Sequence, residues 1–198
     1  MRRICACVAA AVLWLSLCGC DGGWLFKDKP QPVSTTAVTA PQVTVTVESG
    51  CVNVGDTVIL PVTVNADAHL VNADIFLRYD PALLEPVLQY DAETDSERYV
   101  EPGIFSGTVH SELLGAGTLY VLLAAPDNGT ADKGTLFYAA FRLLADPGDG
   151  ATVMPDVSVC RARADGRDVD PIEAGTLTLN AGVITADKTT TTETIAAD

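Results

Sequence analysis

Apolar and polar residues alternate over much of the chain between residues 41 and 184, and a period of two is typical of β-strands. In the segment HLVNADIFLRY, residues 69–79, one set of side chains is apolar and is expected to face a core. Asn72, Asp74 and Phe76 belong to the other set and are expected to point away from it. Further strands are predicted at residues 43–47, 58–64, 107–114, 118–125, 134–145, 151–161 and 175–180.

Short turn sequences separate the predicted strands, among them Asn-Gly, Asp-Gly and Pro-Gly-Asp-Gly clusters. Short strands at regular spacing with such turns favour a β-sandwich or barrel over a βαβ fold. Residues 81–90, PALLEPVLQY, fit either a strand after a turn or a short helix, and the flanking prolines favour the strand. We therefore predict one all-β domain over residues 41–184, a length that can bury a sizeable core.

The N-terminal residues have the pattern of a bacterial export signal. Residues 1–19 combine two arginines with an apolar run, which from Ile4 to Leu17 is too short for a membrane-spanning helix. The residues before Cys20 resemble a lipobox, so Cys20 is expected to carry two acyl chains and to become the mature N-terminus. This predicts a lipid-anchored protein on the extracellular face of the bacterial membrane. The alternative is an ordinary secretory signal with incidental cysteines.

Two segments outside the predicted domain are expected to lack stable structure. Residues 20–40 are rich in Gly, Pro, Ser and Thr and fit a flexible linker. Residues 185–198 form a Thr-rich tail that cannot bury enough apolar surface to fold alone. Membrane attachment would therefore depend on the N-terminus.

Charge narrows the range of partners. The chain has 26 acidic and 12 basic residues, a net charge of −14 at pH 7. Nucleic acids and anionic lipid surfaces are bound by clustered lysines and arginines, which this sequence does not offer. Both are therefore excluded as partners.

Two of the six cysteines, Cys51 and Cys160, belong to the predicted domain. In an oxidising compartment such a pair indicates one disulfide, and the alternative is two free thiols. A structural zinc site needs four ligands, and His69 and His110 lie in unrelated segments. No metal site is therefore predicted.

The outward residues of segment 69–79 combine an amide, a carboxylate, an aromatic ring and, at Arg78, a guanidinium. Such a mixture is found on recognition surfaces, although single exposed aromatic residues are common on ordinary surfaces too. The alternation alone leaves both interpretations open.

Four blocks of sequence, in this order and spacing, resemble a cohesin domain: VGDTVILPVTV, NADIFLRYDPALLE, LYVLLAAPDNGTADKGTLFYAAFRLLA and DPIEAGTLTLN. The similarity covers nearly all of residues 41–184. It implies a nine-stranded jelly-roll β-sandwich without catalytic activity. The implied partner is a dockerin, a small module that carries its own calcium and belongs to glycoside hydrolases or scaffold proteins. The cohesin itself would need no cofactor and would act as a monomeric adaptor at the cell surface.

The resemblance also implies which residues bind the partner. Asn72 and Asp74 match an Asn and an Asp on the dockerin-facing sheet of many cohesins. The other positions implied by the match are Leu123 as an apolar contact, Gly129 in the following loop, and Thr108 and His110 on a neighbouring strand. His110 stands where tyrosine is frequent and Pro126 where some cohesins have an acidic residue, which leaves the dockerin type open.

A carbohydrate-binding module is the alternative function, because such modules share the jelly-roll architecture. Sugars are bound by stacking on aromatic rings, yet Trp14 lies in the signal and Trp24 in the linker. Strand alternation is expected to turn Tyr79 and Tyr120 inward. Direct glycan binding is therefore the weaker hypothesis.

Enzymatic activity is not expected, because the chain has no Gly-x-Ser-x-Gly or His-Glu-x-x-His motif and its glutamates lie in turn-rich segments. In the acidic loop at residues 163–175, Asp165, Asp168 and Asp170 could offer oxygen ligands to calcium. Their spacing differs from an EF-hand, and an Asp-Gly turn between strands explains the loop better.

Overall fold

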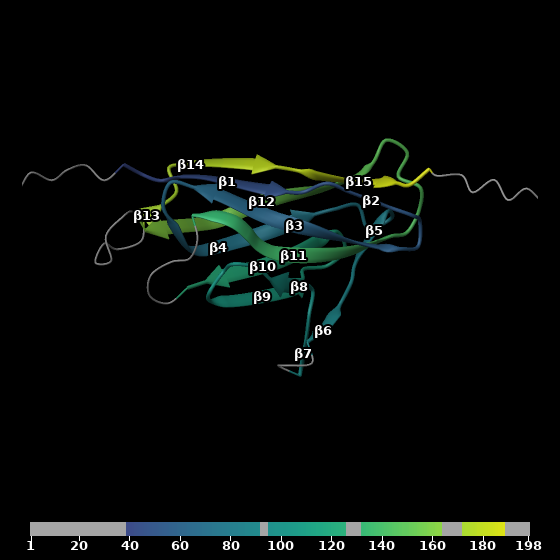
Figure 1. Ribbon diagram of the computed structural model, residues 1–198, viewed down its shortest axis with the longest axis horizontal. Helices are drawn as coiled ribbons and strands as arrows, with labels where there is room; N and C mark the ends of the chain where they lie inside the picture. Colours follow the sequence, from purple (N-terminus) through teal and green to yellow (C-terminus); the bar gives the residue numbers. More distant parts are fainter. Residues whose placement is uncertain (1–38, 92–94, 126–131, 164–171, 189–198) are drawn as a thin grey trace, which may run out of the picture. The chain divides into compact units, whose positions relative to one another are not determined.

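The computed structural model describes residues 39–91, 95–125, 132–163 and 172–188 of the chain. These residues form two β-sheets that pack face to face, together with a short hairpin that projects from them (Figure 1). The part of the chain that is described contains no helix, and so none that could cross a membrane. The signal peptide, Cys20 and most of the linker lie outside the described residues and stay predictions.

The first sheet has the strand order β14-β1-β3-β11-β5, and β8 also pairs with β11. The two central pairings are antiparallel, whereas β1 and β14 run parallel. The strands of this sheet are β1 (Gln42–Val47), β3 (Thr57–Ala66), β5 (Leu84–Pro86), β8 (Val100–Pro102), β11 (Lys133–Leu143) and β14 (Thr176–Asn180).

The second sheet has the order β2-β15-β12-β4-β10-β9, and β13 pairs with β12. Its strands are β2 (Gly50–Val52), β4 (His69–Arg78), β9 (Thr108–Leu113), β10 (Thr118–Ala124), β12 (Ala151–Arg163), β13 (Ile172–Glu173) and β15 (Gly182–Ala186). The projecting hairpin consists of β6 (Gln89–Asp91) and β7 (Ser96–Arg98), seen at the bottom of Figure 1.

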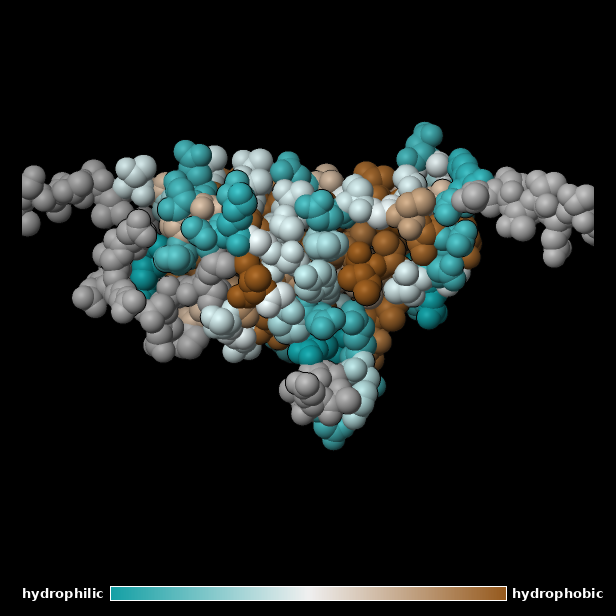
Figure 2. Space-filling view, in the orientation of Figure 1, coloured by the Kyte–Doolittle hydropathy of each residue, from teal (hydrophilic) through white to brown (hydrophobic). Residues whose placement is uncertain are grey.

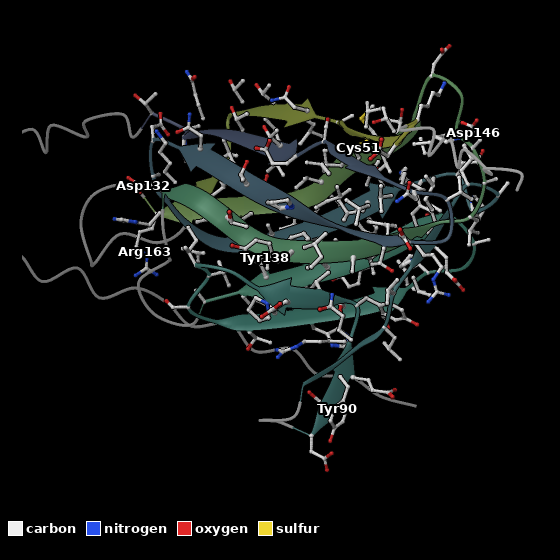
Figure 3. All side chains as sticks on the ribbon, turned by 45° about the vertical axis from the view of Figure 1, so that its right-hand side comes forward. Cys51, Tyr90, Asp132, Tyr138, Asp146 and Arg163 are labelled. Carbon is white, nitrogen blue, oxygen red and sulfur yellow. The ribbon has the colours of Figure 1, made fainter. Side chains whose placement is uncertain are left out.

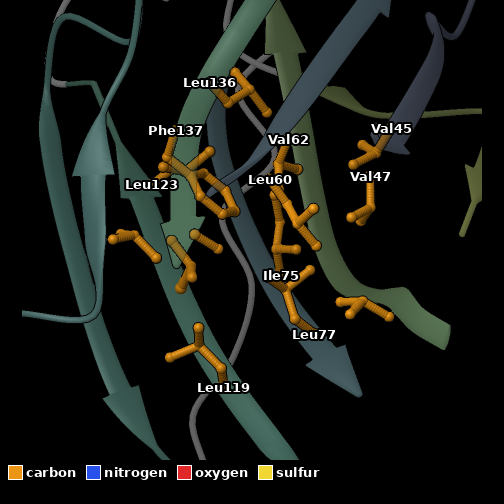
Figure 4. Close-up of a cluster of buried hydrophobic side chains, with 14 of the residues drawn as sticks. Val45, Val47, Leu60, Val62, Ile75, Leu77, Leu119, Leu123, Leu136 and Phe137 are labelled. Carbon is orange, nitrogen blue, oxygen red and sulfur yellow. The ribbon is translucent and has the colours of Figure 1, made fainter. Parts of the chain in front are cut away.

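The inward side chains of both sheets form one core, because every second residue of each long strand is apolar. Phe137 and Phe141 from β11 are fully buried and belong to the same cluster as Leu60 from β3 and Ile75 from β4. Figure 4 shows Phe137, Leu60 and Ile75 in this cluster. Burying one such side chain contributes about 1.5–3 kcal/mol. This shared core holds the two sheets in a fixed relation, and so holds the outer face of each sheet in place.

The structure confirms the all-β sandwich. After Asp80 and Pro81 the chain makes a turn and enters β5, so the strand interpretation of this segment is confirmed and the helix is not formed. The described residues divide into fifteen strand segments. The sequence pattern predicted fewer, because β2, β5 to β8 and β13 have only two or three residues, too few to show a period.

The C-terminal boundary of the domain lies further along the chain than predicted. β15 extends to Ala186, and Thr185 and Ala186 pair with β2, so the first residues of the expected tail are part of the sheet. The Ile184 side chain is fully buried. The sequence pattern did not predict this strand, because GVITA is short and runs directly into the Thr-rich sequence that follows. Residues 189–198 lie outside the described part.

The predicted disulfide is wrong, since Cys51 and Cys160 are both free thiols. Cys51 pairs with Thr185, next to Ile184, which pairs with Ala151 at the start of β12. Cys160 lies nine residues further along β12, which at ~3.3 Å per residue is about 30 Å. A disulfide needs Cα atoms within about 7 Å. In Figure 3, Cys51 and Arg163, which follows Cys160 on β12, lie toward opposite ends.

Candidate functional site

The outer face of four strands, β12, β4, β10 and β9, brings together most of the predicted site residues. We call this surface the β4 face. Residues that pair directly across antiparallel strands share a face, so the register defines rows across it. The rows that contain described residues are Arg161, Asn72, Ala124 and Thr108; then Val159, Asp74, Leu122 and His110; then Asp156, Phe76, Tyr120 and Glu112; and finally Met154, Arg78 and Thr118.

The centre of the β4 face is apolar with one fixed carboxylate. Leu122 on β10 and Val159 on β12 lie on either side of Asp74, and all three side chains are half-buried. The Tyr120 hydroxyl donates a hydrogen bond to Asp74 Oδ1 at 3.1 Å. Asp74 is therefore held in position before any partner arrives, and its second oxygen is left to accept another hydrogen bond.

The environment of Tyr120 shows how this contact is made. Burial raises the pKa of its hydroxyl, and the hydrogen bond to the Asp74 carboxylate raises the pKa further. Its ring lies 5.1 Å from that of Phe76, centroid to centroid. Both rings therefore belong to the β4 face and support each other there.

Tyr120 was expected to face inward, and this expectation is wrong. The inward residues of β10 are Leu119, Val121 and Leu123, so the even-numbered residues face outward. The sequence TLYVLLA is apolar at nearly every position and therefore carries no alternation from which to assign faces. Tyr79 does face the core side, where its ring packs edge to face against Phe141.

Leu123 cannot be the predicted apolar contact for a partner, because its side chain is 0% exposed and lies in the core (Figure 4). Leu122, one residue earlier, occupies the outer face between Asp74 and His110. The error has the same cause as the one at Tyr120. Polar residues in β9 do indicate which side of that strand faces outward. Transferring this assignment to β10 requires the register between the two strands, which the sequence does not give.

The other predicted residues divide into two groups. Asn72, Asp74 and Phe76 lie side by side along β4 and are half-buried, while Thr108 and His110 are exposed on β9. Five predicted residues are thus on one surface. Gly129 and Pro126 lie outside the described residues, and no contact can be assigned to them.

Charged residues border the β4 face at the end near Phe76. Arg78 contacts Asp156 Oδ2 through Nη2 at 2.7 Å and through Nε at 3.1 Å. Both side chains are about half exposed, so the pair contributes little to stability. Its effect is to place a guanidinium and a carboxylate next to the aromatic pair, where they can contact a partner at the rim.

The described residues contain no group of three or more His, Cys, Asp or Glu that could hold a metal ion. Asp165, Asp168 and Asp170 of the acidic loop lie outside the described residues, so the calcium hypothesis for that loop is untested. Four glutamates that could have served as catalytic carboxylates, Glu85, Glu97, Glu101 and Glu112, are exposed. The β4 face instead offers apolar side chains and hydrogen-bonding groups held in fixed positions, and such a surface suits the binding of another protein.

Solved structures with this fold come from bacteria and an archaeon. The seventh ScaB type I cohesin from Pseudobacteroides cellulosolvens is similar, with 18% sequence identity, a TM-score of 0.58, and coverage of 77% of this chain and 96% of that chain. A type I cohesin-dockerin complex from Clostridium thermocellum matches with 17% identity, a TM-score of 0.52, and coverage of 74% and 95%. A non-cellulosomal cohesin from Archaeoglobus fulgidus matches with 18% identity, a TM-score of 0.50, and coverage of 72% and 91%.

These likenesses establish the fold, and the sequence itself gives the family. No curated protein matches the chain. The family model described as "Cohesin domain" matches residues 41–166, which is more than half of the chain. The chain therefore belongs to the cohesin family, whose modules are binding domains without catalytic activity.

Proposed function

We propose that this protein is an adaptor whose β4 face binds a dockerin. The observation that carries the proposal is the arrangement of Leu122 and Val159 around a pre-positioned Asp74, on the sheet that also presents Asn72 and His110. Cohesins of the same fold have been solved in complex with dockerins, among them the type I complex from Clostridium thermocellum. This supports assigning the same class of partner here.

The outer face of a β-sheet with this arrangement of side chains suits an α-helix from the partner. The apolar stripe of an amphipathic helix can lie on Leu122, Val159 and the Phe76 ring without rearrangement of the sheet. Asp74 and Asn72 then accept or donate hydrogen bonds to hydroxyl and backbone groups of the helix. Because each group is held by the sheet, little conformational entropy is lost on binding.

The cellular role follows from the N-terminal sequence. A diacylated Cys20 would hold the domain on the extracellular face of the membrane, with the rest of the linker, up to residue 40, as a spacer. One binding face and one anchor would then keep one dockerin-bearing glycoside hydrolase or scaffold protein at the cell surface. Any calcium required belongs to the dockerin, and the adaptor acts as a monomer.

The proposal is tested by calorimetric titration of residues 21–198 with dockerins from the same genome, in calcium and in chelator. We expect binding with one-to-one stoichiometry that is lost in chelator. Asp74→Ala and Leu122→Asp are expected to weaken binding at least tenfold, since truncating central anchors costs ~2 kcal/mol or more. The matched control is Ile59→Asp, because Ile59 is 58% exposed on the other sheet. Equal weakening by the control would mean that the β4 face is not the binding surface.

One observation favours a second candidate function, direct glycan binding. Phe76 and Tyr120 present two adjacent rings on the β4 face, where the sequence had predicted Tyr120 to be buried. Aromatic rings are the groups on which sugar rings stack. If no dockerin binds, titration with neutral polysaccharides and with a Tyr120→Ala variant tests this alternative.

A further inference from the structure

A groove opens at one end of the sandwich, between the edges of the two sheets. Its volume is about 570 Å³, within the range of ~300–1,000 Å³ that is typical of ligand sites. Three leucines from separate segments line it with partly exposed side chains: Leu88 at 43%, Leu113 at 39% and Leu144 at 43%. Figure 2 shows hydrophobic residues gathered near the base of the β6–β7 hairpin, where Leu88 precedes β6. Such a concentration marks an interaction surface more often than chance exposure does.

The lining of the groove also includes polar groups. Tyr79 forms part of the lining and is fixed by its edge-to-face contact with Phe141, at 5.3 Å between centroids. In the same lining, Arg142 Nη1 lies 3.4 Å from Glu85 Oε2, a long contact between two half-exposed side chains. Because the pair is held loosely, the guanidinium can turn to donate hydrogen bonds to the backbone carbonyls of a bound peptide segment, and the carboxylate can turn to accept hydrogen bonds from its amides.

The groove is continuous with the β4 face through strand β9. Thr108, His110 and Glu112 point outward onto the β4 face, whereas Leu113, the next residue, lines the groove. In the turn after β9, Leu114 is exposed and Ala116 lines the groove. Leu113 lies three positions after His110, which is about 10 Å along a strand. A protein bound on the β4 face can therefore reach the groove within a few residues.

We infer that this groove binds an extended apolar segment of the protein that is bound on the β4 face, immediately beyond its dockerin. The inference rests on the proposed function and extends it from one surface to two. Leucine side chains complement aliphatic or aromatic side chains of a peptide, while Arg142 and Glu85 can satisfy its backbone. The second contact would let the adaptor distinguish partners by the sequence next to the dockerin rather than by the dockerin alone.

The experiment compares two forms of one partner, an isolated dockerin and the same dockerin with its native flanking residues. The test variant is Leu88→Asp/Leu144→Asp, and Arg142→Gln is a milder second variant. Ile104→Asp is the matched control, since it places a carboxylate on an isoleucine that is 44% exposed and whose amide donates a hydrogen bond to the Thr135 carbonyl, seven residues along β11 from the groove residue Arg142. Thermal unfolding of each variant verifies that it is folded. Titrations use residues 21–198 in calcium.

We expect the test variant to bind the long form at least tenfold more weakly than the original chain does, while its affinity for the isolated dockerin changes less than twofold. Equal affinity of original and variant chains for both forms would overturn the inference but leave the proposed function standing. Failure of both forms to bind the original chain would overturn both. Binding of cellohexaose that is abolished by the test variant would also overturn the inference, because it would assign the groove to a glycan.

Discussion

Two adjacent leucines on β10 have different roles, because their side chains point to opposite faces of the strand. Leu123 lies in the core beside the residues of β11, whereas Leu122 lies between Asp74 and His110 on the β4 face. Their chemistry is identical, so any difference between substitutions at the two positions reports position alone. This makes the pair a direct test of the assignment of faces.

Leu123→Ala is expected to destabilise the domain by about 2–5 kcal/mol, because it leaves a cavity in a fully packed core. Leu122→Ala should cost about 1 kcal/mol or less in unfolding free energy but should weaken partner binding. Urea unfolding and calorimetric titration of both variants measure the two effects separately. The opposite pattern, with Leu122 the more destabilising, would contradict the register of β10.

The two cysteines are expected to differ in reactivity. Burial raises the pKa of the Cys160 thiol to about 11, so at pH 8 it is almost entirely protonated, and the thiolate is the reactive form. Cys51 is exposed on β2. A thiol-reactive dye at pH 8 should therefore label one cysteine of residues 21–198 in the folded state and two in urea. Absence of both labels without reductant would indicate the disulfide that the structure lacks.

At the scale of elements, the turn between β9 and β10 connects the β4 face to the groove and depends on glycine. Gly117 has φ +85°, and a Cβ there would lie 2.8 Å from the Tyr79 carbonyl oxygen. Gly115, in the same turn, has φ +78° but open space around its Cβ position. Alanine at Gly115 would therefore add backbone strain alone, whereas alanine at Gly117 would add both strain and steric overlap.

Gly115→Ala is expected to cost about 1 kcal/mol, the usual penalty for a non-glycine residue in the left-handed region. Gly117→Ala should cost at least twice as much, because the added methyl group meets backbone that cannot move aside easily. Chemical denaturation of both variants measures the difference. Equal costs would mean that the Tyr79 carbonyl yields to the new side chain.

At the scale of the whole molecule, the C-terminal strand completes the second sheet. β15 lies between β2 and β12 and contributes the buried Ile184, and the Asp187 amide donates a hydrogen bond to the Val52 carbonyl at 3.0 Å. Without β15, β2 would have no neighbour within its sheet. The second sheet therefore includes Thr185 and Ala186, which the sequence pattern had assigned to a tail.

A chain that ends after Asn180 is expected to lose several kcal/mol of stability, a large part of the ~5–15 kcal/mol typical of a domain. A chain that ends after Lys188 should unfold like the full-length protein. Thermal unfolding of the two truncated chains provides the comparison. Equal melting temperatures would show that β15 adds little to the folded state.

The sequence alone determined the features that depend on local pattern. Alternation along β4 identified the all-β class and placed Asn72, Asp74 and Phe76 outward, because within one strand the period of two assigns faces without knowledge of its neighbours. The ordered blocks of sequence similarly indicated the cohesin family, which the family match confirmed.

Only the tertiary structure decided the features that depend on how distant segments pair. The apolar strand β10 has no alternation of its own, so the outward positions of Leu122 and Tyr120 follow from its register with β4 and β9. The separation of Cys51 from Cys160 and the place of β15 likewise depend on strand order within a sheet. The groove lined by Leu88, Leu113 and Leu144 is formed by segments from both sheets, and no continuous stretch of sequence contains it. Pairing between strands far apart in the chain is set by the packing of the whole core, and this is why local patterns could not supply it.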